Sequence, residues 1–158
     1  MFPQKLKDYL LIALAGTPEV LEGLIANLPP ESLLWDMRPD PARFTLREII
    51  AHLADWESIH FERLNRILRE DTPFIQDIDE GVMAVRNSYA SSDEMEQLMR
   101  FRTGRAKNLE FLSSLTNDEW LRVGNREAIG LMTIEACVAL MLAHDGYHTG
   151  QTAEWLLE

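Results

Sequence analysis

The chain has 158 residues, of which 46% are hydrophobic and 26% are charged, as expected for one soluble globular domain rather than a disordered segment. Its formal net charge of -11 disfavours nucleic acids and anionic membrane surfaces as partners, because these carry charge of the same sign. No apolar run approaches the ~20 residues that cross a bilayer, so we expect a cytoplasmic protein. Cys137 is the single cysteine, and its apolar neighbours predict a core residue rather than a nucleophile.

The first helix is expected over about residues 5–28. Two lysines before the apolar stretch 9–15 weakly resemble a signal peptide, but the adjacent Asp8 and the shortness of the run favour an amphipathic helix. Thr17 suits a helix cap and Pro18 the first helical position, so the pattern predicts a break or kink there.

The second helix is expected to begin after Thr45 and to run to about Glu70. Thr45 and Glu48 have the spacing of a capping box, in which each side chain accepts a hydrogen bond from the other residue's main chain. Most apolar residues in this segment recur every three or four positions, which indicates one buried face: Leu46, Ile49, Ile50, Leu53, Trp56, Ile59, Leu64 and Ile67.

The remaining segments are also expected to be helical. A short helix is predicted at residues 82–87, and capping boxes at 91–94 and 116–119 open a long helix and a single turn. Gly104 lies within the long helix, where glycine costs about 1 kcal/mol relative to alanine. Residues 124–130 are expected to form a loop, and the last helix to run from about Thr133 to Trp155 or beyond. Since no strand pattern of useful length is present, we expect an all-α four-helix bundle that forms one domain over residues 1–158.

Three histidines carry the functional prediction. His144 and His148 are four residues apart, so they share one face of the last helix, and that face is otherwise apolar. His52 lies on the apolar face of the second helix. One divalent ion would satisfy all three rings and leave a coordination position open, as in catalytic rather than closed structural sites. The alternative is a set of core histidines bonded to the backbone or to water.

Other candidates are less specific. His60 is expected at the surface, with roles at the rim of the site or as an extra ligand left open. Asp55 and Asp145 are close enough in sequence to orient a ligand ring, and Trp56 and Gln151 are further candidates for the site. No catalytic residue is predicted, because no nucleophile–base arrangement, phosphate loop or CxxC motif is recognisable.

Two segments resemble a known family. Residues 44–57 (FTLREIIAHLADWE) carry a lone histidine in the second helix, and residues 144–151 (HDGYHTGQ) carry an HxxxH pattern followed by Gly-Gln. In this combination the chain resembles the DinB/YfiT-like superfamily, in its DinB_2 branch. The resemblance implies a four-helix bundle of variant up-and-down topology, a nickel or zinc ion on His52, His144 and His148, and a homodimer.

The resemblance also implies a class of reactions, since characterised relatives include transferases and isomerases that use a small-molecule thiol. The first hypothesis is therefore a metal-dependent enzyme that transfers a thiol to a small electrophile. The second is a noncatalytic metal- or ligand-binding protein of a stress response, and the third is a helical dimer without a metal. Fold and metal ligands alone do not decide among them.

Overall fold

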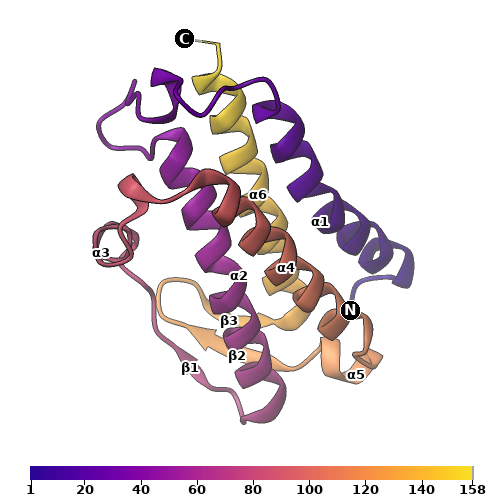
Figure 1. The fold of residues 1–158 in the computed structure, drawn as a ribbon. Helices are drawn as coiled ribbons and strands as arrows, with labels where there is room; N and C mark the ends of the chain where they lie inside the picture. Colours follow the sequence, from indigo (N-terminus) through magenta and orange to yellow (C-terminus); the bar gives the residue numbers. More distant parts are fainter. Residues whose placement is uncertain (158) are drawn as a thin grey trace.

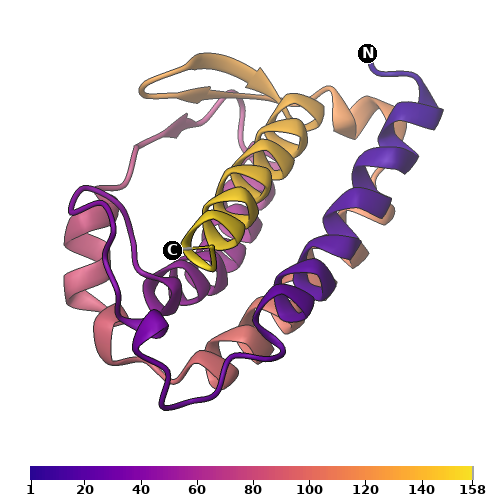
Figure 2. The ribbon, with the colours of Figure 1, turned by 90° about the horizontal axis from the view of Figure 1, so that it is seen from above.

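The computed structural model describes residues 1–157 as a bundle of four long helices (Figure 1). These are α1 (Gln4–Ile25), α2 (Leu46–Arg69), α4 (Glu94–Ser113) and α6 (Ile134–Trp155). Both α1 and α2 pack against α4 and α6, and Figure 2 shows the same bundle from above. The predicted all-α bundle is confirmed. In residues 1–157, no helix is long and apolar enough to cross a membrane.

Shorter elements connect the long helices. They include α3 (Glu80–Arg86), α5 (Asn117–Trp120) and the 3-10 turns η1 (Leu33–Trp35) and η2 (Tyr89–Ser91). The predicted absence of strands is wrong, because β1 (Phe74–Ile75) pairs in parallel with β2 (Val123–Arg126), and β2 pairs antiparallel with β3 (Gly130–Thr133). The expected loop at 124–130 is thus largely a hairpin, which lies across the end of α2 where that helix finishes (Figure 1).

Two of the three predicted capping boxes are present. The Thr45 and Glu48 side chains form the expected capping box at α2, and Thr116 and Glu119 form another at α5. The predicted box at 91–94 is wrong: Asp93 caps α4 by accepting from the Glu96 main chain. The Glu94 carboxylate instead pairs with Arg47 on α2 at 2.5 Å.

The predicted break at Pro18 is also wrong, since α1 is one helix from Gln4 to Ile25 with the proline inside it. The Thr17 hydroxyl donates to the Ala13 carbonyl at 3.3 Å, one turn earlier, rather than capping a new helix. The carbonyl that Pro18 leaves without its usual partner is that of Leu14, and Arg105 of α4 donates to it at 2.8 Å. Tertiary contacts therefore compensate for the proline.

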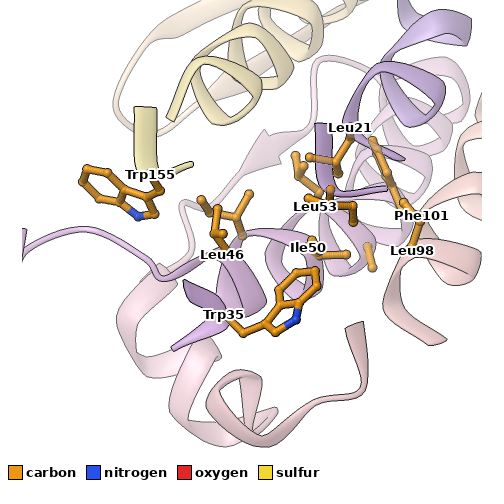
Figure 3. Close-up of a cluster of buried hydrophobic side chains, with 11 residues drawn as sticks. Leu21, Trp35, Leu46, Ile50, Leu53, Leu98, Phe101 and Trp155 are labelled. Atoms are coloured by element: carbon orange, nitrogen blue, oxygen red, sulfur yellow. The ribbon is translucent and has the colours of Figure 1, made fainter. Parts of the chain in front are cut away.

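The interior consists of two large apolar clusters with a polar layer between them, and of a smaller third cluster around Trp56 and Tyr89. One large cluster joins Leu21, Leu53, Phe101 and Trp155 near one end of the bundle (Figure 3), and the other large cluster joins residues such as Leu14, Leu64, Leu112 and Val138. Along each long helix, buried polar residues occur between the residues that belong to these clusters: Thr17, His52, Glu57, His60, Arg63, Arg105, Asn108, Asp145, His148, Gln151 and Thr152. The buried polar side chains in the middle of the bundle are therefore the candidates for a functional site.

Candidate metal centre

His52, His144 and His148 meet in this polar layer. One ring nitrogen from each lies within 4.8 Å of the others, an arrangement that could hold a metal ion. The Nε2 atoms of His52 and His144 face each other at 2.9 Å. Two nitrogens that share an ion at about 2.0–2.1 Å each are at most about 4.2 Å apart, so a shift of under about 1 Å brings all three into range. His60, the fourth histidine, is not part of this group.

Burial keeps these three rings neutral. His52 is fully buried, His148 is 4% exposed and His144 is partly buried. Desolvation, with the neighbouring histidines as a smaller cause, lowers the pKa of His52 to about 2 and that of His148 to about 3. Desolvation and the charge of Arg105 lower the pKa of His144 to about 4. A neutral imidazole has a free lone pair, which is the form that binds a metal.

Hydrogen-bond partners fix the orientation of His148. Its Nδ1 lies 3.2 Å from the Gln151 side-chain oxygen, and the Gln151 amide nitrogen donates to the Phe44 carbonyl at 3.0 Å. Because the amide nitrogen is already used, its oxygen must face His148, so Nδ1 carries the proton and Nε2 keeps the lone pair. The Nδ1 atoms of His52 and His144 are buried without a partner, so only their Nε2 atoms are engaged, with each other. Three neutral imidazole rings with so few hydrogen-bond partners have the free lone pairs that a bound cation requires.

Aromatic rings enclose the histidines. The Phe44 ring centroid lies 4.9 Å from that of His52, and the Trp56 centroid lies 5.3 Å from that of His144. Tyr89 packs edge-on to His52 at 6.4 Å. These rings exclude water from one side of the group and strengthen electrostatic interactions inside it.

A pocket of about 330 Å³ opens onto the other side. His144, His148 and Gln151 form its floor, and Arg43, Glu80 and Tyr147 are among its walls. Desolvation raises the pKa of the Glu80 carboxyl, and the charge of Arg63 opposes this shift. Arg43 is held by the Glu154 carboxylate at 3.0 Å and lies over the Trp155 ring, 4.5 Å from its centroid. The pocket can therefore admit a small polar molecule to the exposed side of the histidines.

Two of the predicted auxiliary residues have other partners. Asp55 accepts hydrogen bonds from Asn87, Tyr89 and Arg100 and bonds to no histidine ring. Asp145 pairs with the buried Arg105 at 2.6 Å. Their expected role of orienting a ligand ring is therefore not supported, whereas Trp56 and Gln151 do contact the histidines.

The prediction of a surface position for His60 is wrong. Its side chain is buried, and its ring centroid lies 5.1 Å from Trp56 and 6.2 Å from His144. His60 lies about two turns beyond His52 on α2, and it lines a small cavity together with Arg126 of the hairpin strand β2 and Cys137 of α6. Because the hairpin was not anticipated from the sequence, neither was this burial.

Sequence reasoning also missed Arg43 and Glu80 in the pocket and the buried ion group around Arg105. Arg43 lies two residues before the Thr45 cap of α2, and Glu80 opens α3, so neither lies on a periodic helix face. The ion group could have been recognised from Arg105, because this charged residue lies four positions after Phe101 and therefore on the same, buried face of the helix.

Comparison with known proteins agrees with this architecture. A sequence profile described as the DinB superfamily matches residues 13–152. One similar solved structure is described as "YfiT from Bacillus subtilis is a probable metal-dependent hydrolase with an unusual four-helix bundle topology". It superposes with a TM-score of 0.90 at 20% sequence identity, over 98% of this chain and 88% of that one. At this identity, the match establishes the fold. No curated protein matches the sequence significantly.

Proposed function

This chain belongs to the DinB superfamily, and we propose that it is a metal-dependent enzyme that activates a small nucleophile in the pocket beside its three central histidines. His52, His144 and His148 would hold one divalent ion. The observation that carries the proposal is the convergence of three neutral imidazoles, within 4.8 Å, next to a pocket that opens to solvent. A bound ion would supply Lewis acidity and lower the pKa of a thiol or water in the pocket.

The protein's own residues would bind the substrate and accept its proton. In thiol addition, the S–H bond breaks and the sulfur forms a bond to an electrophilic carbon. The π bond or ring C–O bond at that carbon opens, and the thiol proton passes through a base to the atom that receives the electron pair. Glu80 lines the pocket, and the raised pKa of its carboxyl makes it a better proton acceptor than an ordinary glutamate. Arg43 and Tyr147, on the same walls, can bind the polar end of a small molecule.

Hydrolysis is a second candidate, supported by the description of YfiT as a probable metal-dependent hydrolase. The two reactions differ in the nucleophile, a thiol or a water molecule, and the pocket volume of about 330 Å³ accommodates either with a small substrate. A noncatalytic binding protein would use the same histidines with no turnover, and a closed coordination shell would favour it.

The identity of the metal and the oligomeric state are also part of the proposal. Three imidazoles suit nickel and zinc, and metal supply in the cell decides between such ions. We further propose a cytoplasmic homodimer. Exposed apolar residues on α1, among them Tyr9, Ile12 and Val20, support self-association. Light scattering after size exclusion tests the dimer independently of the metal.

Elemental analysis of untagged protein is the first test, with His52→Ala, His144→Ala and the control His60→Gln. We expect about one metal per chain in the parent and in His60→Gln, and loss of metal in both alanine variants. Thiol addition to small electrophiles and ester hydrolysis would then be assayed, with Glu80→Gln expected to lower turnover while metal content stays unchanged. A parent protein that binds no metal after reconstitution would refute the metal site.

A further inference from the structure

A small cavity of about 20 Å³ lies between α2, α6 and the strands β1 and β2. His60 and Arg63 of α2, Arg126 of β2 and Cys137 of α6 line it, together with apolar side chains such as Ile67 and Ile75. A cavity needs roughly 10–15 Å³ of such space to hold one water-sized occupant, so this one has room for a single small species.

Three nitrogens of this lining are buried without a hydrogen-bond partner: Nε2 of His60, Nη1 of Arg63 and Nε of Arg126. The two arginine nitrogens can only donate. A buried donor left without an acceptor costs about 1–3 kcal/mol, and native proteins leave few of them. Two such donors in one cavity, beside a His60 nitrogen that also donates in one of its tautomers, indicate that an acceptor belongs there.

The charges of the residues that line the cavity support the same conclusion. Arg63 is 8% exposed, and within residues 1–157 it forms no ion pair. Its Nη2 donates to the Gln76 carbonyl at 3.0 Å, and its guanidinium lies over the Trp56 ring, 5.0 Å from the centroid. Burial and the nearby Arg126 lower the pKa of Arg63. Neither a carbonyl nor an aromatic ring carries a full negative charge, and a buried unpaired charge is strongly unfavourable.

Arg126 pairs with Asp77, the one carboxylate within ion-pair distance of either arginine in residues 1–157. Its Nη2 lies 3.3 Å from Asp77, whose side chain is 36% exposed. The two guanidinium groups therefore share one directly paired, partly solvated carboxylate, and Glu62 and Glu80 act on Arg63 only from beyond ion-pair distance. Direct pairing leaves one guanidinium charge without a partner.

We propose that this cavity binds one small monovalent anion of about chloride size, held by Arg63, Arg126 and His60. The lining side chains include no carboxylate, amide or hydroxyl, so His60 Nε2 is the one side-chain nitrogen there that could accept from a water molecule, and a neutral water would leave the arginine charge uncompensated. An anion only accepts, and it supplies the missing negative charge. The volume excludes phosphate and larger ions. This site is separate from the proposed metal centre and does not depend on it.

Thermal unfolding in chloride is the first test, with gluconate, which is too large for the cavity, replacing chloride at constant ionic strength. Both metal-loaded and chelator-treated full-length protein are measured, because chloride could also bind a metal ion. We expect a saturable rise in Tm in both forms, of about 3–6 °C at ten times the dissociation constant. Formate is tested as a third anion. A similar rise in Tm with formate would show that the site also binds the carboxylate end of a small molecule.

Arg63→Met and its control Arg69→Met separate this site from general salt effects. Arg69 is on the same helix but is exposed and does not line the cavity. The chloride response should disappear in Arg63→Met and persist in Arg69→Met. An equal response in both variants, or no saturable response in the parent, would overturn the proposal.

Bromide crystallography on the parent protein gives an answer even if Arg63→Met does not fold. An anomalous bromide peak between Arg63 and Arg126 is expected. A crystal grown in bromide with a peak elsewhere and none in this cavity would show that water fills it instead.

Discussion

The guanidinium of Arg105 on α4 donates a hydrogen bond of 2.8 Å to the main-chain carbonyl of Leu14 on α1. Pro18 is four residues further along α1 and lacks the N–H that would normally bond to this carbonyl. A side chain from a neighbouring helix thus replaces a bond within α1. The same guanidinium binds the buried carboxylates of Glu57 at 2.7 Å and Asp145 at 2.6 Å, so Arg105 links all four long helices.

Arg105→Met should lower the free energy of unfolding by about 3–5 kcal/mol, because two buried carboxylates lose their counter-charge. Burial by itself lowers the pKa of Arg105, but Glu57 and Asp145 raise it, so the arginine stays charged. The control is Arg102→Met, which removes an exposed pair with Glu22 and should cost at most about 1 kcal/mol. Urea unfolding measures both, and equal losses would contradict the central role of Arg105.

The Leu14 bond can be tested separately by a double-mutant cycle. Pro18→Ala restores an N–H that can reach the Leu14 carbonyl. The loss caused by Arg105→Met should therefore be smaller in the Pro18→Ala background, by about 0.5 kcal/mol or more. Strictly additive effects would mean that Arg105 does not compensate for the proline.

Gly104→Ala is expected to destabilise the bundle although alanine favours helix. A Cβ at Gly104 would lie 2.5 Å from the Cβ of Glu57, so α2 and α4 would have to separate. Overpacking of this kind costs about 1–3 kcal/mol. The matched control is Gly23→Ala on α1, where nothing lies within 4 Å; it should stabilise by up to about 1 kcal/mol. Thermal melts of both variants, with opposite shifts expected, check the prediction.

Periodic and local patterns in the sequence correctly predicted the four-helix framework. The apolar spacing around Trp56 and the capping pair Thr45 and Glu48 were sufficient for α2, since both depend on residues one helical turn apart. The same spacing grouped His144 and His148, and the structure brings His52 to them. That these three bind a metal remains a prediction.

Long-range partners could not be predicted in this way. Asp145 is adjacent to His144 in the sequence, yet it points to Arg105, because successive helical residues face about 100° apart. Pro18 predicted a helix break, because its compensating donor is on another helix. The short strands were missed because β2 has only four residues and no clear alternation. His60 was misplaced as a consequence.

Lower pH should destabilise the metal-free protein through the histidine group. The pKa of His52 falls from 6.5 in the unfolded chain to about 2 in the fold, and that of His144 to about 4. Below pH 6.5 the unfolded state therefore binds more protons, so stability decreases as pH falls from about 6.5 towards 4. The slope is about 1.4 kcal/mol per pH unit for each such histidine.

Urea unfolding of chelator-treated protein at several pH values measures this slope. His52→Phe should reduce the slope by the contribution of one histidine. Glu19→Gln, a substitution at an exposed position, should leave the slope unchanged. Metal-loaded protein should resist acid to a lower pH, because the ion competes with protons for the same nitrogens. A slope unchanged in His52→Phe would mean that carboxylates alone cause the acid sensitivity.

Gln151→Met should weaken metal binding by about 10–100-fold without removing any proposed ligand. Gln151 is 2% exposed, and its amide, anchored on the Phe44 carbonyl, fixes the His148 ring so that Nε2 faces His52 and His144. Methionine keeps the volume but loses both hydrogen bonds, so His148 can adopt other orientations. Competition with a chromophoric chelator measures the affinity, and Gln97→Met on α4 is the control, since Gln97 contacts Arg100 far from the histidines in sequence and on another helix. If Gln151→Met bound metal as tightly as Gln97→Met, the orientation of His148 would have to come from the packing of Phe44 and Tyr147 against its ring instead.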